Sequence, residues 1–144
     1  MRTISPELIR AYREAHYIVL DECTEIRLQV GIVNLELARL MSNKNAHTAS
    51  VLTAYNPYSE VKTKQENELA QMQLRQRLEE LGIATIEAAG RDAKEQWEPE
   101  PSVLALDLTL KEAETLADEY GQNAFIWIPK QDAVIELRLR YLTY

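Results

Sequence analysis

The sequence contains a single cysteine, no long apolar run and fewer basic than acidic residues, 16 against 23, and each of these features limits the class of protein. Because Cys23 is alone, the chain can form neither an internal disulfide nor a zinc site built from several cysteines. No apolar run approaches the ~20 residues that a membrane-spanning helix needs. A net charge of −7 argues against a general nucleic-acid binder and against docking on an anionic membrane.

Histidine and glycine are also scarce. His16 and His47 show no metal-ligand spacing with each other or with carboxylates, so we expect no metal site. The four glycines all have an explanation as a helix cap or a turn, and no Gly-rich phosphate loop is present. We therefore expect no bound cofactor. The N-terminal stretch lacks the apolar core of a signal peptide, so the cytoplasm is the expected location.

The remaining composition is that of an ordinary globular protein. With 144 residues, 46% of them hydrophobic and 27% charged, we expect one domain over residues 1–144 with a core that needs no disulfide or metal. Strands alternate with helices in the middle of the chain, which predicts parallel crossovers, and hairpins at both ends predict antiparallel edges. The predicted fold is α/β with mixed α+β character: a single mixed sheet with about four helices packed on it.

Helix-start signals and hydrophobic periodicity define the predicted elements. Ser5, Asn34, Thr63 and Thr109 are the predicted N-caps, the last two within capping boxes. We predict helices over residues 6–16, 34–41, 63–81 and 109–120, and strands over residues 17–20, 26–30, 49–54, 83–87, 103–108, 123–128 and 133–141.

Two polar stretches, far apart in the sequence, form the candidate site. The first, Thr53-Ala54-Tyr55-Asn56-Pro57-Tyr58-Ser59, follows an apolar strand that the proline forces to stop and turn at Asn56. The second, Gly121-Gln122-Asn123-Ala124, follows the last predicted helix. Ligands of α/β sheets bind at strand ends beside helix N-termini, so we expect these stretches to face each other across a shared pocket.

The residues predicted to bind a ligand supply uncharged donors and acceptors, a guanidinium that can clamp an anion, and an aromatic surface. Such a set fits a nucleotide-like or amide-bearing ligand, with Tyr55, Trp97 or Trp127 as a stacking surface. The predicted ligand-binding residues are Asn56, Ser59, Asn67, Arg91, Trp97, Gln122 and Asn123.

The amide side chains also have a structural interpretation, which stays open at this point. Asn56 and Asn67 can tie the loop together through Asx-type hydrogen bonds. Gln122 and Asn123 can form a polar turn after a helix cap. Trp127 lies in a predicted strand, where packing in the core or at the edge is the more usual role.

The stretch from Gly90 to Pro101 is the least regular part of the chain. It carries Trp97 among charged residues, and two prolines close it. Such a loop either covers a pocket as a lid or is a solvated connector. Glu98 and Glu100 could reach a pocket, and a solvated loop explains them equally well.

The order of these motifs is distinctive. It runs from Ala-Tyr-Asn-Pro through a Glu-Asn pair that opens a long helix, then Gly-Arg before a Trp-containing loop, and finally Gly-Gln-Asn-Ala. Over roughly residues 8–138 it resembles a bacterial family of small cytosolic proteins classed as a domain of unknown function. In that family Thr-Ala-Trp-Asn-Pro is usual, and this chain has Tyr55 in place of the tryptophan. The resemblance implies no activity, substrate or cofactor. The positions that match the family's motifs are Asn56, Pro57, Ser59, Glu66, Asn67, Gly90, Arg91, Gln122 and Asn123.

Three functions of different classes follow from these features. The first, which we favour, is a module that binds a small molecule in the amide-rich pocket. The second is a protein-interaction module whose acidic surface and final strand, with Arg138 and Arg140, meet a partner. The third is an enzyme that works through Arg91 and a loop carboxylate.

Overall fold

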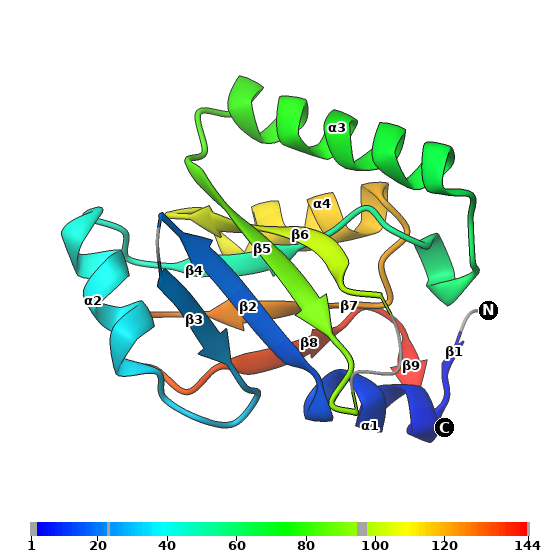
Figure 1. Ribbon diagram of the computed structural model, residues 1–144, viewed down its shortest axis with the longest axis horizontal. Coiled ribbons are helices and arrows are strands. Elements are labelled where there is room, and N and C mark those ends of the chain that lie inside the picture. The colour runs from blue at the N-terminus through cyan, green and yellow to red at the C-terminus, as the bar shows by residue number, and fades with distance from the viewer. Residues whose placement is uncertain (1–2, 23, 95–97, 144) are drawn as a thin grey trace.

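The computed structural model of the chain describes residues 3–22, 24–94 and 98–143. Seven strands form one curled sheet in the order β3-β2-β5-β6-β4-β7-β8 (Figure 1). A separate parallel pair joins β1 (Thr3–Ile4) to β9 (Leu142–Thr143). The strands of the sheet are β2 (His16–Asp21), β3 (Thr24–Leu28), β4 (Ala49–Leu52), β5 (Thr85–Arg91), β6 (Glu100–Leu106), β7 (Ala124–Ile128) and β8 (Glu136–Leu139).

The prediction of parallel crossovers in the middle of the sheet is wrong, because all neighbouring strands of this sheet are antiparallel. The helix between β4 and β5 and the helix between β6 and β7 each link two strands that run in the same direction. A third strand lies between the two in each case: β6 between β4 and β5, and β4 between β6 and β7. Both arrangements give the same alternation of strands and helices along the chain, so the alternation cannot distinguish them.

The predicted hairpins at the two ends of the chain are confirmed. β2 pairs with β3 at one edge of the sheet, and β7 pairs with β8 at the other. The two edges approach each other at one end of the curl, where the Gly31 N–H donates to the Ile135 carbonyl at 2.8 Å and Val33 bridges Val134. The sheet is therefore a half-barrel whose edges meet at one end.

Four α-helices cover the sheet in the described part of the chain, as expected. Each begins at its predicted N-cap residue, whose side-chain oxygen accepts a backbone N–H. Figure 1 shows α3 and α4 together on one face of the sheet, with α2 and α1 near opposite ends of the curl. The helices are α1 (Pro6–Glu14), α2 (Leu35–Asn43), α3 (Lys64–Glu80) and α4 (Leu110–Glu119).

The alternation of side chains along the strands makes two hydrophobic cores. Inside the curl, Leu104 and Leu106 of β6 pack with Leu37 and Met41 of α2. On the outer face, residues one position away along the same strand pack against α3 and α4. Trp127 belongs to this outer core and is 4% exposed, so it packs in the interior and presents no stacking surface.

No helix in the described ranges is both long and apolar enough to cross a membrane.

Candidate functional site

The Asn-Pro turn that follows β4 has an unusual backbone. Asn56, Tyr58 and Ser59 all adopt left-handed conformations, with φ of 45°, 59° and 59°. Pro57–Ser59 forms the short 3₁₀ helix η1, which follows Asn56 and precedes the loop that leads to α3. Asparagine tolerates this region, whereas tyrosine and serine are strained there. Strain of this kind persists only where the surrounding contacts fix it, and it gathers at functional sites.

The contacts that hold the turn come from the Gly-Gln-Asn stretch after α4. The Tyr58 N–H donates to the Gly121 carbonyl at 2.6 Å, and the Gln122 Nε2 donates to the Tyr55 carbonyl at 3.0 Å. A Cβ on Gly121 would lie 2.8 Å from the Cβ of Pro57, closer than side-chain atoms pack. The two stretches thus face each other as expected, in direct contact where these bonds form.

The side chains of Asn56 and Asn67 bond to each other. Asn67, on the first turn of α3 and 6% exposed, accepts from the Asn56 N–H at 2.9 Å and donates to the Asn56 Oδ1 at 2.9 Å. The Asn56 Oδ1 also accepts from the Lys62 N–H at 3.0 Å. Both amides therefore tie the turn to α3, which is the structural alternative that the sequence left open.

Ser59 and Asn123 belong to a second tie, made with α1. The Asn123 Nδ2 donates to the Ser59 Oγ and to the Tyr12 hydroxyl, both at 3.1 Å. The two hydroxyls share a hydrogen bond of 2.9 Å. Tyr12 was not among the predicted site residues, since it lies within the first predicted helix, far in the sequence from both polar stretches.

Arg91 does not join this cluster. Arg91 ends β5 opposite His16 on β2, and its Nε is buried without a hydrogen-bond partner among the described residues. Its neighbour Gly90 pairs with Glu100 on β6. Because adjacent residues of a strand point to opposite faces, Arg91 and Glu100 project from opposite faces of the sheet. Trp97 lies outside the described residues.

Beside the Asn-Pro turn lies an open groove of about 650 Å³. One wall comes from the turn and the segment that leads into α3, and the other comes from the chain that enters β6. A smaller cavity of about 80 Å³ lies inside the curl, and Glu100 borders both spaces. The residues that line the groove are Tyr55, Asn56, Val61, Lys62, Lys64, Asn67, Glu98, Pro99, Glu100 and Pro101.

Glu100 is the most perturbed carboxyl group of this region. Burial raises its pKa from the ordinary 4.5 to about 7, and a hydrogen bond from the Asn56 side chain offsets part of that rise. Between about pH 4.5 and 7 the Glu100 carboxyl is therefore protonated in the folded protein and ionised in the unfolded chain. The contribution of Glu100 to the free energy of unfolding falls as the pH rises across this interval. The pKa of the neighbouring Tyr17 is raised, chiefly by burial and to a lesser extent by the charges of Tyr12 and Glu100.

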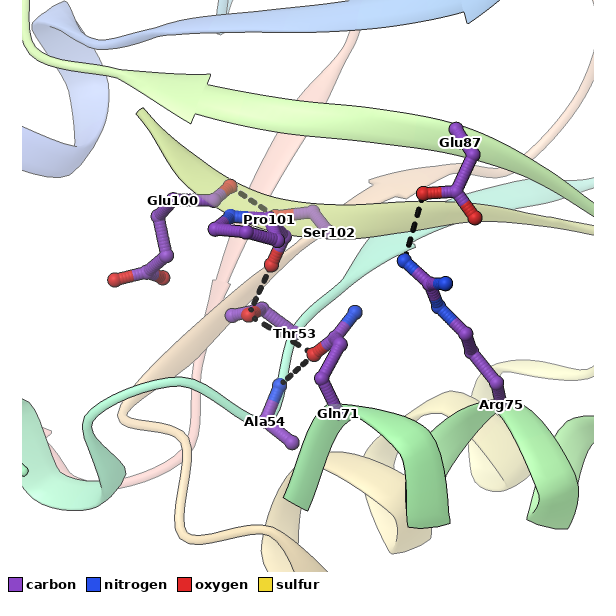
Figure 2. Close-up of polar contacts among 8 residues, drawn as sticks. All are labelled: Thr53, Ala54, Gln71, Arg75, Glu87, Glu100, Pro101 and Ser102. Carbon is purple, nitrogen blue, oxygen red and sulfur yellow. Dashed lines mark hydrogen bonds and ion pairs between the residues drawn. The ribbon is translucent and has the colours of Figure 1, made fainter. Parts of the chain in front are cut away.

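The start of β6 is bonded to the segment that follows β4, and that segment is bonded in turn to α3 (Figure 2). The Thr53 hydroxyl donates to the Pro101 carbonyl at 2.8 Å, directly beside Glu100. The Oε1 of Gln71 on α3 accepts from the Ala54 N–H at 2.8 Å. Gln71 is 4% exposed; it lies three residues before Leu74 and seven before Leu78, so the periodicity of α3 places it on the buried face, although it was not among the predicted site residues. These bonds fix the position of the Glu100 backbone relative to the turn.

Sequence reasoning mentioned Glu100 only as a loop carboxylate and left it out of the predicted site. The one signal available was its position between Pro99 and Pro101, at the entry to an apolar strand. Among the described residues, no three histidine, cysteine or acidic side chains gather as a metal site would require.

The chain matches one protein-family model, described as "Protein of unknown function (DUF3293)", over residues 52–125. The matched segment is just over half of the 144 residues and runs from the end of β4 into β7, so it contains both turns and the groove. No curated protein and no solved structure matches the chain.

Proposed function

We propose that this protein binds a small molecule in the groove beside its Asn-Pro turn. The chain belongs to the DUF3293 family of proteins of unknown function. The observation that carries this proposal is the position of Glu100. A carboxyl group with a pKa of about 7 borders a groove of about 650 Å³, a volume typical of ligand sites.

The composition of the groove supports the same conclusion. Tyr55, Pro99 and Pro101 offer apolar surface, while Lys62 and Glu100 offer charge, a mixture that small-molecule sites usually have. The two hydrogen-bonded ties of the turn make the groove wall rigid before a ligand arrives. Preorganisation of this kind reduces the entropic cost of binding.

The site differs from the amide-rich pocket that the sequence suggests. The Asn56 and Asn67 side chains bond each other, the Gln122 side chain bonds the backbone, and the Asn123 side chain bonds the hydroxyls of Tyr12 and Ser59. Their role in this proposal is to shape the groove, and the charged groups meet the ligand. Nucleotide-like and amide-bearing molecules remain candidates, since Tyr55 can stack and Glu100 can accept or donate a hydrogen bond.

The other two hypotheses receive less support. For a protein-interaction module, Arg140 would have to be free, but it bonds Asp118 through two nitrogens and Glu114 through a third, all at 2.8 Å. For an enzyme that uses Arg91 with a loop carboxylate, the strand register sets Arg91 and one of the two candidate carboxylates, Glu100, on opposite faces of the sheet.

The proposal is tested by screening nucleotides, amides and other metabolites for a rise in Tm, and by mapping the hits with NMR. Val61 lines the groove and is 90% exposed, so Val61→Trp fills the groove without removing a buried contact. Leu35→Trp is the matched control, because Leu35 is 72% exposed and lies outside the groove. We expect hits whose binding is lost in Val61→Trp and kept in Leu35→Trp. A screen without hits, or hits that both variants bind equally, would overturn the proposal.

A further inference from the structure

We infer that the ligand of the groove is a zwitterion, with a protonated amine that meets Glu100 and an anionic group that meets Lys62 and Lys64. This inference rests on the proposed function and narrows its ligand to a chemical class. It stands on the distribution of charge along the groove walls.

The acidic wall lacks a cation. Glu100 takes part in no salt bridge with the described residues, and its hydrogen-bond partner is the neutral amide of Asn56. Buried carboxylates are normally paired with a cation or kept protonated. A ligand ammonium would supply the missing charge from the groove side, and the exposed Glu98 on the same wall would reinforce it.

The basic wall has cations that are only loosely paired. The Lys62 Nζ lies 3.5 Å from Glu60, and the Lys64 Nζ lies 3.8 Å from Glu68. Both acidic partners are more than half exposed, and ion pairs of this kind are weak because water screens them. Lys64 is also the first residue of α3, where the helix dipole favours an anion. An anionic ligand group can therefore replace these contacts at little cost.

The balance of the two walls selects a ligand with both charges. A dication would meet the two lysines, and a dianion would meet the two glutamates, so each would face repulsion on one side. An amino acid-like molecule satisfies both walls, and Tyr55, Pro99 and Pro101 provide apolar surface for the chain between its charged ends.

Binding of an ammonium requires the ionised form of Glu100. Affinity should therefore rise with pH as Glu100 loses its proton, from pH 6 to pH 8, and binding should lower the pKa of Glu100. The titratable and charged groups around this carboxyl come from several elements: Tyr12 of α1, Tyr17 of β2, Tyr55 after β4, Lys62 and Lys64 before and at the start of α3, and Glu98 before β6. None of these groups ordinarily titrates between pH 6 and 8, so the pH dependence reports on Glu100.

The test is a calorimetric titration at pH 8 with ω-amino acids from β-alanine to 6-aminohexanoate, which scan the distance between the two charges. Putrescine and succinate are the single-sign controls. We expect at least one ω-amino acid to bind tenfold or more tightly than both controls, and about tenfold more weakly at pH 6 than at pH 8. Glu100→Gln should weaken it at least tenfold and abolish the pH dependence.

Lys62→Gln should also weaken binding at least tenfold, whereas Lys130→Gln should not. Lys130 is the matched control, because it too pairs weakly with an exposed acid, at 3.9 Å, and lies outside the groove. Tm values confirm that each variant folds. The zwitterion inference fails, and the proposed function stands, if other molecules bind in the groove and lose their affinity in Val61→Trp, but ω-amino acids bind no more tightly than putrescine and succinate. The same holds if ω-amino acids bind Glu100→Gln as tightly as the unsubstituted protein. If nothing binds, both fail.

Discussion

Replacement of Gly121 by alanine tests the packing of the two turns on which the groove depends. Gly121 and Gly82 both follow a helix and both have a left-handed backbone, with φ of 65° and 74°. An alanine at either position costs about 1–2 kcal/mol of backbone strain. At Gly82 no atom of the described residues lies within 4 Å of the added Cβ, so backbone strain is the whole cost.

At Gly121 the added Cβ also collides with the other turn. It would lie 2.8 Å from the Cβ of Pro57 and 3.1 Å from the ring of Tyr58. The proline ring is rigid, and the Tyr58 N–H is bonded to Gly121 itself, so neither neighbour can move away easily. Overpacking of this kind adds about 1–3 kcal/mol. The free energy of unfolding should therefore fall by about 2–5 kcal/mol in Gly121→Ala and by about 1–2 kcal/mol in Gly82→Ala.

Urea unfolding followed by circular dichroism measures both changes. At roughly 3 °C per kcal/mol for a chain of this size, Tm should fall by roughly 6–15 °C in Gly121→Ala and by roughly 3–6 °C in Gly82→Ala. The m-values should stay unchanged if only the native state is affected. Equal losses in the two variants would refute the reasoning, because the collision with Pro57 would then contribute nothing.

Two further predictions concern hydrogen bonds made by side chains. Asn67→Ala removes two hydrogen bonds and leaves the Asn56 N–H without its acceptor, so the free energy of unfolding measured in urea should fall by about 2–3 kcal/mol. The control is Gln73→Ala on the exposed face of α3, which should change this free energy by less than ~0.5 kcal/mol. Arg140→Gln should lower the free energy of unfolding at pH 7, and this loss should shrink as the pH falls below about 4. The reason is that Arg140 lowers the pKa of Asp118, and the stabilisation from this pair disappears once Asp118 is protonated. A loss that is the same at pH 7 and pH 3 would contradict the assignment to Asp118.

Local signals predicted the helices and the edges of the sheet well. An N-cap such as Thr63 acts within one turn of chain, so a single sequence carries all the information about it. The relative direction of neighbouring strands depends instead on which strands meet after folding. The insertion of β6 between β4 and β5 leaves no mark on either strand's own sequence, and the parallel arrangement was therefore predicted wrongly.

For the candidate site too, the sequence predicted one part correctly and could not predict another. The two turns were expected to face each other across a shared pocket, from their positions after a strand and a helix. They do face each other, but in direct contact through the hydrogen bond from Tyr58 to Gly121. Which side chains remain free to meet a ligand depends on three-dimensional pairing. Asn67 has a hydrogen-bond partner, whereas Glu100 forms no salt bridge with the described residues, and no spacing in the sequence distinguishes the two.

The pKa of Glu100 tests the central claim most directly. In protein with ¹³C-labelled glutamate carboxyl groups, comparison with Glu100→Gln identifies its NMR signal, and a pH titration gives its pKa. The account predicts a pKa of about 7 in the free protein and a clear decrease when the tightest-binding ω-amino acid saturates the groove. A pKa near the ordinary 4.5 that does not change with the ligand would contradict it, because Glu100 would then be a solvated carboxylate without a role in binding.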